Sequence, residues 1–188
     1  MAVVEFALTT RLEAEPVALR PLRMEDVPAY AAAFEVDREL GRLLGMETDP
    51  DEASLRKAVE RQTPGFEERK HAQLAIVDAA SDGFLGEMLI HSLSAHNRRC
   101  ELGFFVLPSQ RGRGVASRAV GLALDWLFGE LDLLRVEITT TPDNTIVPLL
   151  AERLGFQREG LLRGRNFERG QRVDLVWFGL LREEWHGV

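Results

Sequence analysis

The sequence predicts an α/β (α+β) protein built on one mixed sheet of about seven strands flanked by helices. One observation is that strand-length apolar runs alternate with runs at helical spacing along most of the 188 residues. Another is that a segment with two glycines leads directly from a strand into a helix, which is followed by a further strand. That order indicates a parallel pair within the sheet. With 45% hydrophobic and 28% charged residues, we expect a single domain over residues 1–188.

The front of the chain is mostly helical. Alternating residues predict a strand over residues 17–23, and an Ala-rich helix with an acidic first turn follows over residues 24–36. Residues 37–48 have no clear period and form either helix or loop. A second helix covers residues 52–62 and stops near Pro64.

Strands dominate the rest of the chain. They are expected over residues 71–78, 83–93, 99–107, 133–140, 156–164 and 171–181, with one helix after the glycine segment and another from Asn144 to Gly155. The first three of these strands suit an antiparallel meander, because a short turn joins the first two. The strands at 99–107 and 133–140, fourth and fifth in order, pair in parallel. If these two strands diverge, they leave a cleft between them.

Composition excludes several classes of protein. A formal net charge of −7 argues against general nucleic-acid binding, and no apolar run has the length of a membrane span. The first residues lack a basic region of the kind that opens a signal peptide, and Cys100 stands alone. We therefore expect a cytoplasmic protein with neither a nucleic acid nor a membrane as partner.

The segment PSQRGRGVAS, residues 108–117, has the features of a phosphate cradle. Gly112 and Gly114 tolerate positive φ, and a helix that starts around Gly112 directs unpaired N–H groups at an anion. Arg111 and Arg113 add donors for phosphate oxygens. The alternative is an ordinary strand-to-helix turn whose arginines face water, and an isolated Gly-x-Gly favours that alternative. The segment matches neither a Walker loop nor a dinucleotide fingerprint.

Two ordered motifs decide between these interpretations. The run CELGFFVLPSQRGRGVASRAVGLALDWLF resembles motif A of the GCN5-related N-acetyltransferases (GNAT), with Arg111, Gly114 and Ala116 at its fixed positions. The run VEITTTPDNTIVPLLAERLGFQREGLLR is similar to the next block of that family, in which Asn144 and Phe156 keep the family spacing. The resemblance covers about residues 17–185 and is closest to the Rim-type (RimJ/RimL) ribosomal-protein N-terminal acetyltransferases. It implies the acyl-CoA N-acyltransferase fold, splayed between the fourth and fifth strands.

The resemblance implies acetyl-CoA as the acetyl donor. Its pyrophosphate is expected on the amides of residues 111–116, and its pantetheine arm beside the FFVL strand, bonded by the main chain of Phe105 and Leu107. Asn144 either holds that arm or caps the following helix, and the two roles are compatible. The full set implied for the donor is Phe105, Val106, Leu107, Gln110, Arg111, Gly112, Arg113, Gly114, Val115, Ala116, Ser117 and Asn144.

Acetyl transfer needs an oxyanion donor and a base. A main-chain N–H near Phe105 or Val106 suits the first role. The candidate bases are Glu101, Glu87, His91 and Glu137, of which Glu101 ranks first because many relatives carry a Glu there. The alternative for Glu101 is a strand residue that is merely paired with Arg98 or Arg99.

The chain also departs from its relatives. Rim-type proteins are thought to use a Ser as acid and a Glu as base where this chain has Val147 and Asn166, which can do neither. Tyr30, the only tyrosine, lies in the first helical segment, so no standard acid is visible. Tyr30, Met46 and Phe66 are instead candidate acceptor contacts.

The expected function is direct transfer of an acetyl group from acetyl-CoA to an amine in a ternary complex. The acceptor is an N-terminal α-amino group of a protein such as a ribosomal protein, or alternatively a small amine: an amino acid, a polyamine or an antibiotic. A non-catalytic acyl-CoA sensor is the remaining alternative. No metal is expected, because the histidines lack ligand spacing. The aromatic residues Trp126, Phe128, Trp177 and Phe178 belong to the core or to a subunit interface, which leaves a homodimer open.

Overall fold

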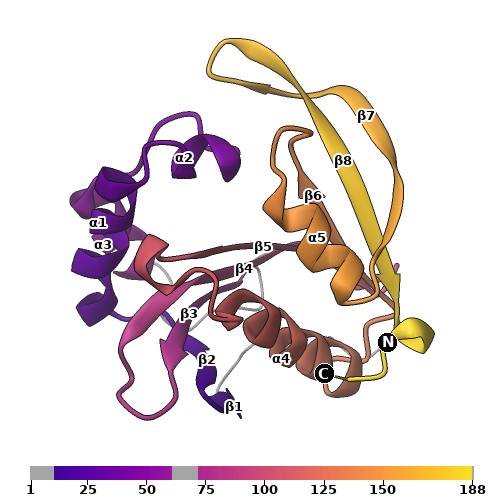
Figure 1. Ribbon diagram of the computed structural model, residues 1–188, viewed down its shortest axis with the longest axis horizontal. Helices are drawn as coiled ribbons and strands as arrows, with labels where there is room; N and C mark the ends of the chain where they lie inside the picture. Colours follow the sequence, from indigo (N-terminus) through magenta and orange to yellow (C-terminus); the bar gives the residue numbers. More distant parts are fainter. Residues whose placement is uncertain (1–10, 61–71, 188) are drawn as a thin grey trace.

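The computed structural model describes residues 11–60 and 72–187 (Figure 1). Its strands are β1 (Leu12–Ala14), β2 (Val17–Pro21), β3 (Ala72–Asp78), β4 (Phe84–Ser94), β5 (Arg99–Val106), β6 (Arg135–Thr140), β7 (Gln157–Glu168) and β8 (Gln171–Leu181). Its helices are α1 (Val27–Val36), α2 (Leu40–Leu43), α3 (Glu52–Glu60), α4 (Val115–Gly129) and α5 (Ile146–Arg153), with short 3₁₀ turns η1 (Met24–Asp26), η3 (Pro108–Gln110) and η4 (Arg182–Glu184). The expected stop near Pro64 and the contact by Phe66 lie outside the described residues.

The strands form one mixed sheet in the order β1-β2-β3-β4-β5-β6-β8-β7. The seven predicted strands are all present, and β1 adds an eighth within the described residues. The pairing of β5 with β6 is parallel, and its register joins only Arg99–Glu101 to Arg135–Glu137. Beyond that point the two strands part, as Figure 1 shows, so the predicted divergence of the fourth and fifth strands is confirmed.

Two predicted boundaries were wrong. Helix α4 begins at Val115 rather than around Gly112, because Gly112 and Gly114 have φ of 75° and 77° and cannot be helical. Strand β7 continues to Glu168, since register shifts near Gly160 and between Leu162 and Asn166 let it bend without losing its partner β8.

Helices cover both faces of the sheet. On one face α4 and α5 pack against an apolar core that includes Leu124, Leu127 and Phe178. On the other, α1 and α3 cover a second cluster centred on Tyr30, Phe34 and Phe105. Each fully buried side chain of this size contributes roughly 1.5–3 kcal/mol to folding.

The aromatic residues of the second half divide between core and cavity. Trp126, Phe128 and Phe178 are buried in the core, as predicted, whereas Trp177 is partly exposed and lines the cavity described below. No helix among residues 11–60 and 72–187 combines the length and apolar character of a membrane span.

Candidate active site

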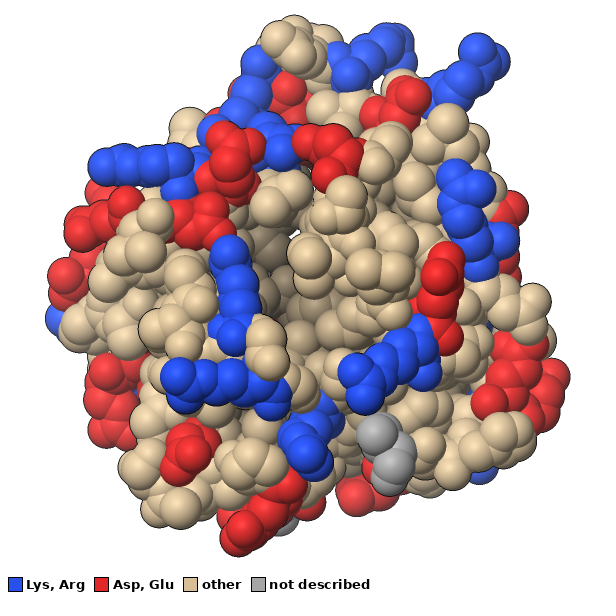
Figure 2. Space-filling model, in the orientation of Figure 1, with Lys and Arg blue, Asp and Glu red and all other residues tan. Residues whose placement is uncertain are grey.

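A cavity of about 870 Å³ opens where β5 and β6 part. Its walls come from α2 and the residues after it, β4, β5, the glycine segment with the start of α4, the end of β6, α5, and the β7–β8 hairpin. In the space-filling view of Figure 2 the molecule is hollowed at this place. Basic side chains gather below the hollow, over the glycine segment and α4, whereas acidic side chains occur among basic ones on its upper rim. The lower rim therefore suits an anionic group.

The glycine segment has the main-chain geometry of an anion site. Gly114, with φ of 77°, is the residue before the first turn of α4, and no side chain caps that turn. A Cβ at Gly112 or Gly114 would meet nothing within 4 Å, so glycine is required there by the left-handed backbone and not by crowding. The first amides of α4, from Val115 to Ser117, have no acceptor within their own helix and line the cavity. These amides are suited to phosphate oxygens.

The residues predicted for the donor largely come together. The cavity is lined by Phe105, Val106, Gln110, Arg111, Gly112, Gly114, Val115, Ala116, Ser117 and Asn144. Arg113 and Leu107 are not among the lining residues. The side chain of Arg113 instead makes a long contact, 3.4 Å, to Gln110 Oε1.

Alternate residues of β5 direct their main-chain N–H and C=O groups into the cleft. The Leu107 N–H donates to Leu85 O at 2.8 Å, so it faces β4. The Phe105 carbonyl faces β4 as well. If Gly86 of β4 carried a Cβ, that atom would lie 2.1 Å from the Phe105 oxygen. Since consecutive residues of a strand direct their N–H and C=O groups to opposite edges, Phe104 and Val106 face the cleft. The expectation for Phe105 and Leu107 as main-chain partners is corrected accordingly, whereas the Val106 N–H faces the cleft and its role as oxyanion donor stays a prediction.

Asn144 performs one of its two predicted roles visibly. Its Oδ1 accepts from the N–H groups of Ile146 and Val147 at 3.1 and 3.2 Å, which caps the first turn of α5. Because Asn144 also lines the cavity, its Nδ2 donors are placed for a second role toward a ligand.

Glu101 lies on the sheet face that looks into the cavity. The Thr139 hydroxyl donates to its Oε1, and its Oε2 lies 3.9 Å from His91 Nδ1. Its side chain is 12% exposed. The alternative pairing is not observed: Arg99 donates to Glu137 at 2.6 Å, and Arg98 donates to the Asp132 carbonyl.

The other candidate bases separate clearly. Glu137 accepts from Arg99 and Arg135 and does not line the cavity, so it is a structural carboxylate. His91 lines the cavity opposite Glu101, and its Nδ1 lies 3.1 Å from Ser92 Oγ. By its position, His91 is a neighbour of Glu101 in the cavity wall.

Glu87, the remaining candidate base, lies in the cavity wall. The Tyr30 hydroxyl donates to its Oε2 at 2.5 Å, and Gln73 Nε2 donates to its Oε1 at 3.0 Å. Burial raises the pKa of Glu87 to about 7, against the opposing effect of these two hydrogen bonds. Tyr30 itself is buried, and burial raises the pKa of its hydroxyl. Tyr30 is therefore a support behind the wall rather than the acceptor contact that the sequence suggested.

The positions of the missing family acid and base are in the cavity but carry no suitable group. Val147 and Asn166 both line it, and Asn166 Nδ2 donates to Glu168 Oε1 at 2.6 Å. The structure thus brings these two positions to the reaction space and leaves proton transfer to other residues.

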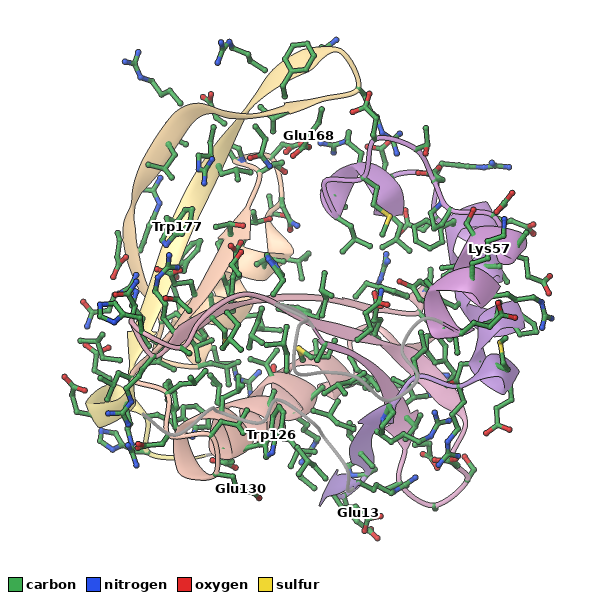
Figure 3. The ribbon with its side chains drawn as sticks, turned by 180° about the vertical axis from the view of Figure 1, so that it is seen from behind. Glu13, Lys57, Trp126, Glu130, Glu168 and Trp177 are labelled. Carbon is green, nitrogen blue, oxygen red and sulfur yellow. The ribbon has the colours of Figure 1, made fainter. Side chains whose placement is uncertain are left out.

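The upper wall is closed by contacts between distant segments. At the tip of the β7–β8 hairpin, Arg169 donates to the Met46 carbonyl at 3.0 Å, and its Nη2 donates to Asp49 at 2.6 Å. Its N–H donates to Glu47 at 2.7 Å. Figure 3 shows the neighbouring Glu168 between the hairpin and α2, whereas Lys57 lies on the outer side of α3. Met46, a predicted acceptor contact, lines the cavity beneath this closure.

Known proteins resemble this chain in sequence and in fold. The chain matches the acetyltransferase (GNAT) domain over residues 17–157. It is 30% identical over 177 residues to YdaF of Bacillus subtilis, and the match covers 92% of this chain and 95% of YdaF. YdaF is named, provisionally, as a ribosomal N-acetyltransferase. A shorter match of 75 residues, 33% identical and covering 40% of each chain, joins it to spermidine N(1)-acetyltransferase of Escherichia coli. The structure of Mycobacterium smegmatis RimJ in complex with CoA-disulfide gives a TM-score of 0.81 at 25% identity and covers 93% of this chain and 87% of that one.

Proposed function

Since the chain belongs to the GNAT acetyltransferase family, we propose that it transfers the acetyl group of acetyl-CoA to the N-terminal α-amino group of a protein, in the manner of a ribosomal-protein acetyltransferase. The observation that carries this proposal is the likeness over nearly the whole chain to a protein with a ribosomal N-acetyltransferase name and to RimJ. The lone buried Cys100 fits a reducing compartment, so we place the reaction in the cytoplasm.

The cavity fits acetyl-CoA as a substrate. Unpaired amides of α4 and the basic lower rim suit its phosphates, and the edge of β5 that carries Phe104 and Val106 suits the amide groups of its arm. When acetyl-CoA is bound, its thioester supplies the electrophilic carbon. Holding that carbon and the amine together accounts for much of the expected acceleration.

The chain's own residues complete the reaction site. The Val106 N–H faces the cleft and stabilises negative charge on the acetyl oxygen. Glu101, oriented by Thr139, removes the proton that the amine nitrogen loses as the amide forms. Attack by the amine is direct in this proposal, and Cys100, which is buried in the core, is not placed to carry the acetyl group.

A small amine is the second candidate acceptor. The contacts of Arg169 with the residues after α2 close the upper wall of the cavity, which favours a compact acceptor. The partial likeness to a spermidine acetyltransferase points in the same direction.

Thiol release from acetyl-CoA tests the proposal with three sets of acceptors: peptides with free N-termini, the same peptides with blocked N-termini, and small amines. We expect turnover with free N-termini only, and mass spectrometry should place the acetyl group on the α-nitrogen. If polyamines or amino acids exceed every peptide in kcat/KM by tenfold or more, the acceptor assignment is wrong. Tight acetyl-CoA binding without turnover on any amine would support the sensor instead.

A further inference from the structure

Glu87 is a cavity carboxyl that the mechanism above leaves unused. Its side chain is buried between α1 and the sheet, with the Tyr30 hydroxyl on one oxygen and the Gln73 amide on the other. It nevertheless lines the cavity. A carboxyl with two hydrogen-bond donors behind it and a reaction space in front of it is placed to exchange a proton with whatever occupies that space.

The sheet register orders the two carboxyls along β5. Glu87 lies opposite Phe105, Leu89 opposite Gly103, and His91 opposite Glu101. All of these side chains share one face of the sheet, because paired and alternate residues do so. Glu87 and Glu101 are therefore separated by four residues of strand, about 13 Å.

The glycine segment begins just beyond the end of β5, on the side of Phe105. If phosphates bind at that segment and the arm follows the free edge of β5, the arm passes Glu87 before it reaches Glu101. In acetyl-CoA the sulfur precedes the acetyl carbon, and the attacking amine lies beyond that carbon. The leaving sulfur thus lies on the Glu87 side of the carbon and the amine on the Glu101 side. Because sulfur and nitrogen are bonded to the same carbon and lie only about 3 Å apart, two carboxyls about 13 Å apart cannot both touch them, and the link to Glu87 runs through water.

We propose that Glu87 is the acid of this reaction, held by the positioning residue Tyr30, and that it protonates the departing CoA sulfur through a water molecule in the cavity while Glu101 serves the amine. The inference rests on the proposed acetyl transfer. A neutral amine forms the C–N bond, the C–S bond breaks, and its electron pair goes to sulfur. The O–H bond of Glu87 breaks as its proton passes to a water molecule, that water gives a proton to sulfur to form the S–H bond, and the nitrogen loses one proton to Glu101. Solvent protons then restore Glu87, and Glu101 releases its proton to solvent.

The protonation state of Glu87 agrees with this assignment. Because burial raises its pKa to about 7, a large share of Glu87 carries a proton at neutral pH. Among the described residues, the groups that bond to it come from α1 and β3, and of these only Tyr30 is titratable. The Tyr30 hydrogen bond acts in the opposite direction to burial and lowers the pKa of Glu87.

Tyr30 is itself fixed by aromatic contacts. Its ring centroid lies 5.2 Å from that of Phe105 and 5.8 Å from those of Phe34 and Phe84. This packing holds the hydroxyl at Glu87 and joins the acid to the strand that carries Val106. A Tyr30→Phe change keeps the ring contacts and removes only the hydrogen bond.

The experiment compares Glu87→Gln, Tyr30→Phe and, as a matched control, Glu137→Gln, which neutralises a buried carboxyl on the same sheet face outside the cavity. We expect Glu87→Gln to lower kcat about 100-fold with acetyl-CoA affinity by calorimetry within twofold of the wild type. In the wild type, kcat at saturating amine should fall as pH rises above about 7, since the acid loses its proton. That fall should be absent from Glu87→Gln, shifted to higher pH in Tyr30→Phe, and unchanged in Glu137→Gln.

Carbon NMR of the side-chain carboxyls in the ligand-free protein gives a readout apart from turnover. One glutamate should titrate near pH 7 in the wild type, be absent from Glu87→Gln and titrate higher in Tyr30→Phe. If the wild type acetylates amines and Glu87→Gln keeps both its kcat and the fall at high pH, this inference is overturned and the proposed function stands. If the folded wild type binds acetyl-CoA but acetylates no amine, the proposed function fails, and the inference fails with it.

Discussion

Arg111 joins the end of β5 to the segment that follows α1. Its Nη2 donates to Asp37 Oδ2 at 2.6 Å, and its Nε donates to the Val106 carbonyl at 3.1 Å. The two partners belong to different elements, since Val106 lies on β5 and Asp37 is the C-cap of α1. The side chain of Arg111 is therefore engaged in holding the glycine segment in place, and its main chain remains to contact an anion.

Replacing Arg111 with Met should loosen the glycine segment without unfolding the protein. Hydrogen bonds to charged groups contribute roughly 1.5–3 kcal/mol to stability. Part of the free energy of the Arg111 hydrogen bonds serves to hold the acetyl-CoA site in position. We expect the KM for acetyl-CoA to rise about tenfold, which corresponds to about 1.4 kcal/mol. Arg113→Met is the matched control, because within the part of the chain that the structure describes the Arg113 side chain makes a single long contact, 3.4 Å, to Gln110. Equal effects of the two changes in steady-state kinetics would mean that only local charge matters.

Gly114→Ala tests the left-handed residue before α4. The φ of 77° costs an alanine roughly 1–2 kcal/mol, whereas the space around the added methyl is open. We expect a fall in Tm of about 2–8 °C and a higher KM for acetyl-CoA. Gly114→Asn should lower the Tm less and raise the KM for acetyl-CoA less, because asparagine tolerates this conformation better.

Gly129→Ala supplies the control for that change. Gly129 ends α4, has no positive φ, and a Cβ there would meet nothing within 4 Å. This substitution should leave the KM unchanged and preserve or slightly raise the Tm. If Gly114→Ala behaves in the same way, the backbone conformation of Gly114 is not what shapes the anion site.

Local signals explain which parts of the fold could be predicted. Apolar periodicity located the seven longer strands and the helices α1, α3, α4 and α5, but left α2 open as helix or loop, and the strand-helix-strand order located the parallel pair. Strand β1 was missed because three residues, Leu12–Ala14, carry too little pattern. The start of α4 was misplaced because the sequence shows that glycine permits positive φ but not that Gly112 and Gly114 both adopt it.

For the candidate site, too, local sequence signals predicted part of the arrangement and tertiary contacts decided the rest. Motif spacing brought the donor residues together, and alternation along β4 placed Glu87 and His91 on one face. The Tyr30–Glu87 hydrogen bond spans 57 residues and depends on how α1 packs across the sheet, for which no local pattern exists. The orientation of the Leu107 amide depends on the register of β5 with β4, which is a tertiary property.

Glu101→Gln should separate chemistry from binding. The substitution preserves the shape of the side chain and can still accept from Thr139, but it cannot take a proton. We expect kcat to fall by about 100-fold or more while the KM for acetyl-CoA stays within about twofold. Thr139→Val should lower kcat more modestly, since Glu101 then loses its orienting partner. Full kcat in Glu101→Gln would remove Glu101 as the base.

Arg169→Ala should act on the acceptor side alone. It removes the contacts that tie the β7–β8 tip to Met46 and Asp49 and thereby opens the upper wall. We expect the KM for the amine to change several-fold, while the KM for acetyl-CoA stays constant, because the glycine segment lies on the opposite wall. Measuring both constants with one long and one short acceptor peptide decides the matter. If only the KM for acetyl-CoA changes, the Arg169 contacts act on the donor side of the site and this prediction is wrong.

Glu87 should make the stability of the protein depend on pH in a direction that is unusual for a carboxyl group. Its folded pKa of about 7 exceeds the ordinary value of 4.5, so folding favours its protonated form. This contribution to stability is complete below about pH 4.5 and is lost as the pH rises through 7. Glu87→Gln cannot ionise, so between pH 5 and pH 8 its free energy of unfolding, relative to the wild type, should improve by up to about 3 kcal/mol. Urea unfolding at both pH values measures this difference. A constant difference would show that Glu87 is ionised in the folded protein at pH 5 and would remove it as a store of the proton.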